Sequence, residues 1–265
     1  MHKLARCVRF SINPFLSGES TGFNEFVSMP AGEGLSIFLE LSVELVGEVE
    51  PTTGFVVNVA DIDRNVREFA VPVFAERIKQ TFGRAEHVGF STMAELLGSA
   101  WSRLADRFGT ARLSTLALKL NPFRKIAINS KDLGMVYFSE KFEFAAMHKL
   151  WNDGFSEERN FAVFGKCANP TGHGHNYIVE VTITVPAERN AFRLGDFEKT
   201  VDDELVRLLD HKNLNVDVDR FSQINPTVEN IACFAWNKLV GKFGGATLHC
   251  VTIWETDKTC CSYFG

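Results

Sequence analysis

The sequence of 265 residues contains no apolar run approaching the roughly 20 residues that a helix needs to cross a bilayer. Its first residues, Met1 to Arg6, lack the apolar core that follows the basic segment of a signal peptide. The six cysteines do not show the spacing of a small secreted disulfide framework. We therefore expect a cytoplasmic protein with no membrane partner, in which most cysteines act as small buried hydrophobic residues.

An excess of positive charge is also absent, because the net charge is −5. Residues 1–135 hold 15 basic and 15 acidic side chains, whereas residues 136–265 hold 13 and 18. A general nucleic-acid role is therefore not favoured. The composition, 45% hydrophobic and 23% charged, is typical of a globular protein with one large or two small domains.

The chain contains an internal repeat. At a constant offset of 135, Trp101 aligns with Trp236 and the pair Phe108-Gly109 with Phe243-Gly244. Upstream, the turn Pro30–Gly34 aligns with Pro170–Gly174 at an offset of 140, and shifting offsets indicate loops of different length. Chance similarity is the alternative, but several distinctive residues fall in order. The repeat predicts two structural copies, residues 1–130 and 135–265, joined near residues 129–134.

The sequence pattern of the second copy predicts two strands, then two helices, then two further strands. Strands are expected over residues 136–146, 177–185, 247–255 and 260–264 from their alternating hydrophobic residues. One helix is expected from a cap at Asp196 to Leu209, with Phe197, Val201, Leu205 and Leu208 on one face, and a second from Thr227 to about Phe243. This order predicts an α+β fold, an antiparallel sheet with helices on one face.

A candidate metal site lies in the segment Gly165–Tyr177. His173 and His175 are two residues apart at the start of a strand, so their side chains share a face, and His148 ends another strand. Three histidines suit a zinc site whose fourth position is open, as in catalytic sites. Cys167 is close in sequence and could be a fourth ligand instead, which would make the site closed and structural.

Two further groups carry potential chemistry. Asp210-His211 follows a helix, and a carboxylate beside a histidine can prepare it to take a proton from a thiol. The alternative is a histidine that complements the helix dipole. Glu255 ends a strand and could pair with a flat, nitrogen-rich ring, although a solvated strand end is the more common role.

At these residues the sequence resembles a known family, the 6-pyruvoyl-tetrahydropterin synthases and their bacterial relatives, the 6-carboxy-tetrahydropterin synthases. The matching stretches follow in family order and cover nearly all of residues 136–265: Phe144–His148, Gly165–Tyr177, Leu209–Leu214, Pro226–Ile231 and Trp254–Asp257. The resemblance implies tandem tunnelling-fold (T-fold) units, each a four-stranded antiparallel sheet with two helices on one face, that assemble into a barrel as a homo-oligomer.

The resemblance also implies an activity and roles for individual residues. The family substrate is 7,8-dihydroneopterin triphosphate, which loses triphosphate while its side chain is rearranged by a zinc-dependent lyase. The implied residues are His148, His173 and His175 as Zn²⁺ ligands; Cys167, Asp210 and His211 as catalytic residues; and Glu255, Thr227 and Glu229 as substrate-binding residues. In this assignment Cys167 is a proton acceptor and not a zinc ligand.

The first copy departs from the family at the metal-ligand and catalytic positions and at the two acidic substrate-binding positions. The residues aligned with site positions are Ser20, Val27, Glu33, Leu35, Ala75, Glu76, Ala94 and Leu120. We therefore predict that residues 1–130 form a non-catalytic copy that completes the barrel. Its arginines, such as Arg64, Arg67 or Arg103, could help to hold the triphosphate.

Three alternatives stay open at the level of the sequence. The first is a 6-carboxy-tetrahydropterin synthase of queuosine biosynthesis, which acts on the same substrate. The second is a pterin-binding or metal-binding protein without turnover. The third is another tandem tunnelling-fold enzyme acting on a purine-like ring, although such enzymes generally lack this set of histidines.

Overall fold

The structure, a computed structural model, describes residues 1–15, 36–187 and 192–265. The chain divides into two compact units, Met1–Phe138 with Val185–Asn190 and Ser139–Thr184 with Ala191–Gly265. Both units run through two strands, a long helix interrupted by a π-helical turn, a second helix and two final strands. Of the first-copy positions named above, Ser20, Val27, Glu33, Leu35 and the turn Pro30–Gly34 lie outside the described residues.

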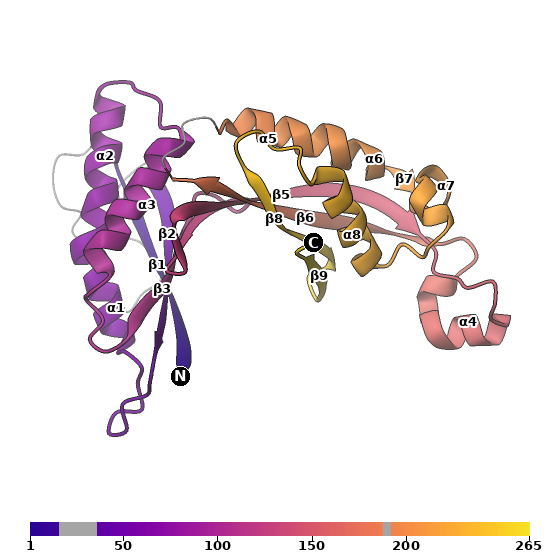
Figure 1. Ribbon diagram of the computed structural model, residues 1–265, viewed down its shortest axis with the longest axis horizontal. Coiled ribbons are helices and arrows are strands. Elements are labelled where there is room, and N and C mark those ends of the chain that lie inside the picture. Colours follow the sequence, from indigo (N-terminus) through magenta and orange to yellow (C-terminus); the bar gives the residue numbers. More distant parts are fainter. Residues whose placement is uncertain (16–35, 188–191) are drawn as a thin grey trace. The chain divides into compact units, whose positions relative to one another are not determined.

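The first unit has four antiparallel strands in the order of the sequence: β1 (His2–Ile12), β2 (Ile37–Gly47), β3 (Arg112–Lys119) and β4 (Arg124–Asn129). Its helices are α1 (Val59–Asn65), continued by the π-helical η1 (Val66–Ala70) and α2 (Val71–Gly83), and α3 (Phe90–Leu104). Figure 1 shows α2 and α3 along one face of these strands. Alternate residues of β1, such as Val8 and Phe10, are buried because they point towards this helical layer.

The second unit repeats this plan with strands β5 (Asp132–His148), β6 (His173–Pro186), β8 (Thr247–Thr256) and β9 (Thr259–Tyr263), adjacent in that order. The first helix consists of α5 (Leu194–Val201), the π-helical η3 (Asp202–Val206) and α6 (Arg207–Leu209), and the second is α8 (Val228–Leu239). Shorter elements are α4 (Glu157–Phe164), η2 (Gly165–Ala168), β7 (Lys212–Asn213), α7 (Leu214–Asp217) and η4 (Asp219–Ser222). Figure 1 shows α5, α6 and α8 over one face of the strands and α4 beyond their end.

The α+β architecture predicted from the sequence is confirmed. The pairs β6–β8 and β8–β9 are antiparallel, and the two-residue strand β7 adds a parallel pairing to β5. The described strands of each unit form an open sheet that is not closed into a barrel. Assembly of several units into a barrel therefore stays a prediction.

The first helix of the second unit differs from the prediction in its buried face and in its start, and the π-helical turn explains the difference in the face. In a π-helical turn, residue i is hydrogen-bonded to residue i+5 instead of i+4. The next buried residue therefore comes one position later than in a regular α-helix. Leu209 is consequently fully buried, whereas the predicted Leu208 is 39% exposed. The helix also begins earlier than predicted, because Arg193 is its N-cap and Asp196 lies inside the first turn. There its carboxylate still complements the helix dipole.

Two further differences concern the other helices of the second unit. The helix α8 begins as predicted, with Thr227 as its N-cap, but ends at Leu239 instead of near Phe243. The helix α4 was not predicted from the sequence. Ser156 caps its N-terminus by accepting a hydrogen bond from the Arg159 backbone N–H.

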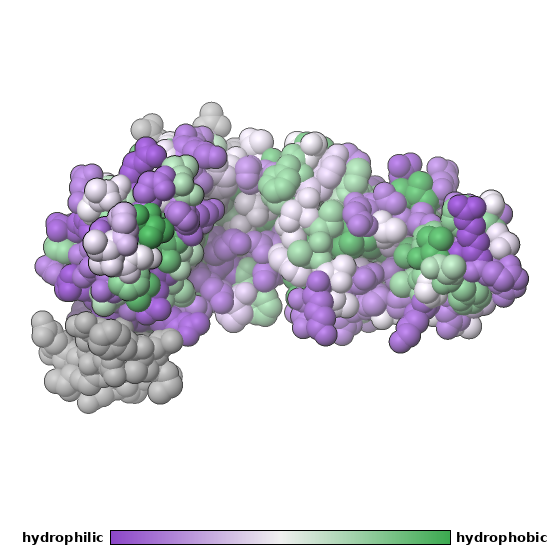
Figure 2. Space-filling model, turned by 90° about the horizontal axis from the view of Figure 1, so that it is seen from below, coloured by the Kyte–Doolittle hydropathy of each residue, from purple (hydrophilic) through white to green (hydrophobic). Residues whose placement is uncertain are grey.

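The face shown in Figure 2 is largely hydrophilic, with hydrophobic residues in smaller groups between the polar ones. None of the helices in the described ranges combines the length and the hydropathy that a membrane span requires.

Candidate metal centre and active site

Three histidines meet at the end of the second unit's sheet. His148 is the last residue of β5, where it follows the buried Phe144 and Ala146 on the side facing the helices. His173 and His175 begin β6 and share one face of it. One ring nitrogen of each histidine lies within 4.8 Å of the corresponding atoms of the other two. Residues distant in the sequence thus form one nitrogen-lined cluster, as the spacing predicted.

The hydrogen bonds of His148 leave its Nε2 available as a ligand. Its Nδ1 lies 2.9 Å from the backbone carbonyl of Pro226 and 3.3 Å from the hydroxyl of Tyr177. A carbonyl only accepts, so Nδ1 carries the proton and Nε2 holds a lone pair. Burial lowers the pKa of His148 below its usual value. A histidine that binds a metal ion is neutral, and its other ring N–H usually donates a hydrogen bond to a neighbouring acceptor, as Nδ1 does here.

The arrangement of the other nitrogens fits a tetrahedral cation. The Nε2 atoms of His148 and His173 are 3.2 Å apart. Two nitrogen ligands of a tetrahedral Zn²⁺ ion, at bonds of about 2.1 Å, are separated by about 3.4 Å. The Nε2 of His175 is buried without a hydrogen-bond partner among the described residues, and burial lowers the pKa of this side chain. The donor set therefore fits zinc in both chemistry and spacing.

Glu255 and Cys167 face the same cluster. The Oε1 atom of Glu255, at the end of β8, lies 3.6 Å from His148 Nε2 and 3.8 Å from His175 Nε2. The Sγ atom of Cys167 lies 3.8 Å from His173 Nε2. Burial, and next the charge of Glu255, raise the pKa of the Cys167 thiol. The thiol is consequently protonated at neutral pH when no cation lies beside it.

The pair Asp210–His211 is anchored to the backbone of β5. Asp210 Oδ1 accepts a hydrogen bond of 2.9 Å from the Ala145 N–H, and the His211 N–H donates to the Ala145 carbonyl. The second carboxylate oxygen lies 2.8 Å from His211 Nδ1. The bond from Ala145, and next that from His211, lower the pKa of Asp210. His211 has a positive φ of 56°, a conformation that is uncommon for a residue with a side chain.

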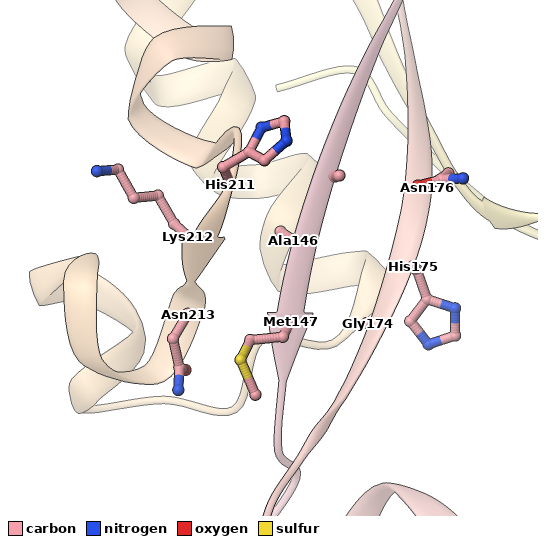
Figure 3. A pocket seen from close by; sticks show the side chains of 9 residues that line it. Ala146, Met147, Gly174, His175, Asn176, His211, Lys212 and Asn213 are labelled. Atoms are coloured by element: carbon pink, nitrogen blue, oxygen red, sulfur yellow. The ribbon is translucent and has the colours of Figure 1, made fainter.

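An open cavity of about 420 Å³ lies beside this pair, and His211 and His175 are among the residues that line it. Figure 3 shows them on opposite sides of the two strands that carry Ala146 and Gly174. Within the described part of the chain, neither Asp210 nor His211 forms a hydrogen bond with Cys167. The structure thus brings Cys167 and Glu255 to the histidines, and it places the Asp210–His211 pair separately, on the edge of β5.

The remaining predicted residues begin α8. Thr227 Oγ1 accepts a hydrogen bond from the Asn230 N–H and caps this helix. Glu229 is exposed in its first turn. The residue before them, Pro226, supplies the carbonyl that holds His148. Reasoning from the sequence assigned no role to Pro226 or Tyr177, because contacts between distant segments leave no local pattern.

Two predicted arginines of the first unit already have partners. Arg64 pairs with Asp61 in the same helix, and Arg67 donates to the backbone carbonyl of Arg9. Their role towards a triphosphate, like that of Arg103, stays a prediction.

A glycine next to the cluster gives the first test of this geometry. Gly172 has a φ of +68°, and a Cβ there would lie 2.7 Å from the backbone oxygen of His148. We expect Gly172→Ala to destabilise the fold by about 1–3 kcal/mol because the strain and the clash act together. We also expect zinc affinity to fall at least about tenfold, because His148 must shift.

Gly174→Ala is the matched control for Gly172→Ala. At Gly174 a Cβ would lie 3.6 Å from its nearest neighbour, the Ala146 backbone oxygen, which is an ordinary contact. Thermal unfolding and a zinc competition titration would compare the two variants. Equal zinc affinities in both would show that the close approach at Gly172 does not position His148.

Comparison with known proteins matches this part of the chain to one family. The family model of "6-pyruvoyl tetrahydropterin synthase" matches residues 137–265. The 6-pyruvoyl tetrahydrobiopterin synthase of Homo sapiens is 38% identical over 130 residues, which are 48% of this chain and 90% of that protein. That of Drosophila melanogaster is 34% identical over 135 residues, 49% of this chain and 80% of that one. The solved 6-pyruvoyl tetrahydropterin synthase of Caenorhabditis elegans is 32% identical, with a TM-score of 0.47 over 49% of this chain and 96% of that one.

Proposed function

This chain belongs to the 6-pyruvoyl tetrahydropterin synthase family, a family of lyases, and from this membership we propose that it is a zinc-dependent lyase. The proposed reaction converts 7,8-dihydroneopterin triphosphate to 6-pyruvoyl-tetrahydropterin with loss of triphosphate. The observation that carries the proposal is the three-histidine cluster with Cys167 and Glu255 directed at it.

We assign the zinc ligands to His148, His173 and His175, which offer three ring nitrogens within 4.8 Å of one another. A Zn²⁺ ion held by these histidines would supply Lewis acidity towards the hydroxyl groups of the substrate side chain, which would make the adjacent C–H bond more acidic. The Pro226 carbonyl fixes the tautomer of His148, so this ligand is oriented before any cation arrives.

Cys167 is the proposed proton acceptor. Its thiol lies beside the histidines and is protonated when no cation is near, so its basic form depends on positive charge in the site. Asp210 keeps His211 in an orientation suited to proton transfer through the 2.8 Å contact with Nδ1. The pair forms no hydrogen bond with Cys167 within the described chain, and we assign it the role of an acid–base group that acts on the substrate separately from Cys167.

Glu255 is the proposed anchor of the pterin ring, and Thr227 and Glu229, at the start of α8, are the other proposed substrate-binding residues. A carboxylate can accept two hydrogen bonds from an amino-pyrimidine edge, and charge-assisted bonds orient a ligand strongly. Since Glu255 also faces the histidines, this bond would hold the ring close to the metal centre.

Glu255→Gln gives a direct test of that role. Losing the charge, while keeping the shape, should lower kcat/KM by about 10- to 100-fold, the equivalent of one hydrogen bond to a charged group. Steady-state kinetics would show this mainly as a higher KM. Glu157→Gln, at the exposed start of α4, is the control. An unchanged KM in Glu255→Gln, with zinc retained, would exclude Glu255 as the anchor.

The reaction itself is tested by product mass. The zinc-loaded protein is incubated with 7,8-dihydroneopterin triphosphate, beside a chelated sample, and the products are analysed by mass spectrometry. A zinc-dependent 6-pyruvoyl product is expected. A 6-carboxy product with acetaldehyde would instead assign the chain to queuosine biosynthesis. Bound zinc without any product would contradict a lyase acting on this substrate.

For residues 1–130 we propose a non-catalytic role as a structural copy. The two units share their order of elements, but the first lacks the histidines, the cysteine and the acidic residues of the site. We propose that it contributes to a homo-oligomeric barrel together with the catalytic unit. Substitutions over its surface that left both assembly and turnover unchanged would contradict this role.

A further inference from the structure

The four residues that follow His148 have an unusual set of backbone partners. Residues 149–152, which we call the amide hub, lie outside any helix or strand. Each of their N–H groups nevertheless donates to a different segment of the second unit. Backbone donors in irregular chain need partners when they are shielded from water. In the amide hub those partners come from the segments that carry the candidate site residues.

Three of the four acceptors are asparagine side chains. The Lys149 N–H donates to Asn215 Oδ1 at 2.7 Å, and the Trp151 N–H donates to Asn225 Oδ1 at 2.9 Å. The Asn152 N–H donates to Asn160 Oδ1 at 2.8 Å, and the Asn160 side chain is completely buried. The fourth donor, Leu150 N–H, bonds to the backbone carbonyl of Cys167 at 2.8 Å.

Each bond connects the chain directly after His148 to a segment that contains, or lies next to, a candidate site residue. Asn215 lies in α7, just after the Asp210–His211 pair and β7. Asn225 immediately precedes Pro226, whose carbonyl holds His148. Asn160 lies in α4, which leads directly into η2 and Cys167. The amide hub is therefore the place at which the segments of the metal ligand His148, the thiol of Cys167 and the acid–base pair are joined to the segment that leads into α8.

We propose that Asn215 and Asn225 are positioning residues of this site, acting through the amide hub. Asn225 holds the Pro226 carbonyl against His148, and therefore sets zinc affinity. Asn215 holds the segment that follows the Asp210–His211 pair, and therefore sets the rate of the chemical step. This second assignment rests on the lyase function proposed above, whereas the first does not.

The two side chains use different atoms, which makes them separable by substitution. Asn225 uses only its side-chain oxygen in the hub, and its backbone carbonyl accepts from Asn230 Nδ2. Asn215 uses both ends of its amide, because its Nδ2 also donates to the Lys149 carbonyl at 3.0 Å. Aspartate keeps the acceptor but has no N–H to donate, and leucine has neither.

The first experiment measures zinc affinity by competition with a chelating dye. We expect Asn225→Leu to weaken zinc binding by about 10- to 100-fold, the usual effect of losing a group that orients a ligand. Asn225→Asp should restore most of that affinity. Asn215→Leu should stay within about twofold of the unsubstituted protein. Because no substrate is involved, this comparison holds whether or not the protein proves to be a lyase.

The second experiment measures turnover of 7,8-dihydroneopterin triphosphate at saturating zinc. Both Asn215→Leu and Asn215→Asp should lower kcat by about 10- to 100-fold with KM changed less than about twofold, because a small displacement of an acid–base pair acts on the chemical step. The proposed contacts thus predict opposite results for the two aspartate variants. Asn225→Asp should regain zinc affinity, whereas Asn215→Asp should not regain kcat.

The control is Asn237→Leu, the same substitution at an exposed site on α8 outside the amide hub. Circular dichroism would establish that each variant is folded, and the aspartate variants provide a second reading if a leucine variant unfolds. Equal zinc affinity in Asn225→Leu and Asn225→Asp would overturn the role of Asn225. Full rescue of kcat by Asn215→Asp would overturn that of Asn215.

Discussion

Replacing Cys167 by alanine is expected to lower kcat by about 10²- to 10⁴-fold while the protein keeps its zinc. The size of this decrease is the usual contribution of a positioned proton acceptor to the rate. Its Sγ atom is 3.8 Å from His173 Nε2, so the thiol stands at the edge of the metal cluster. Turnover and zinc content, measured on the same preparation, give the two readings that are needed.

The comparison of these readings decides between the two roles that the sequence left open for Cys167. A proton acceptor can be removed without loss of the metal, because three histidines still bind it. A fourth ligand cannot, and its loss would release zinc and lower stability together. Zinc loss from Cys167→Ala would therefore identify a closed structural site and contradict the proposed lyase.

Cys233→Ala provides the matched control for that substitution. Cys233 is half-buried in α8, where its sulfur accepts a hydrogen bond from the Asn237 side chain. It is thus a thiol of the same unit whose hydrogen bond, to Asn237, involves none of the site residues. Normal turnover in this variant would show that the effect at Cys167 belongs to its position and not to the loss of a buried thiol.

The parts of the site that the sequence predicted are those set by local geometry. His173 and His175 share a face because side chains alternate along a strand, and this needs no knowledge of the rest of the fold. The cap at Thr227 is equally local, since its hydroxyl bonds to a residue three positions later. The α+β class followed from the order of alternating and helical patterns in the same way.

The parts that the sequence did not predict depend on contacts between distant segments. The proton of His148 is fixed by the carbonyl of Pro226, 78 residues further along the chain. Any residue type provides a backbone carbonyl, so the sequence carries no signal for it. The burial of Leu209 instead of Leu208 depends on a π-helical turn, which the regular helical period does not include.

The position of Asp210–His211 shows a different limit. The sequence placed this pair after a helix, and the structure agrees, because α6 ends at Leu209. The direction of the pair, however, is set by its two bonds to the backbone of Ala145 on β5. Adjacent polar residues indicate that chemistry is possible, but the cavity that His211 lines follows from the pairing of β7 with β5.

Replacing His175 by alanine is expected to weaken zinc binding by more than about 100-fold and to reduce turnover to the background rate. His175 is the best of the three ligands for this test because it is only half-buried, whereas His148 is 1% exposed and supports the core. The loss of its ring should therefore leave the fold intact. Zinc content by metal analysis, together with turnover at increasing zinc, would measure both effects.

The thermal stability of the unsubstituted protein gives an independent measurement of the same site. A ligand that binds only the folded state, present at 1,000 times its dissociation constant, stabilises that state by about 4 kcal/mol. Zinc should therefore raise the melting temperature of the unsubstituted chain, and a chelator should reverse the shift. In His175→Ala, a loss of at least about 100-fold in zinc affinity leaves at most about a third of that stabilisation at the same zinc concentration, so the shift should be correspondingly smaller.

His249→Ala is the control for His175→Ala, because His249 is an exposed histidine of β8 that lies outside the three-histidine cluster. It should keep both the zinc-dependent shift and full turnover. If His175→Ala also kept the shift, the cation would have to bind elsewhere. If it lost the shift but kept turnover, zinc would stabilise the fold without taking part in the reaction. The combined loss of both therefore connects the geometry of these three histidines to the proposed chemistry.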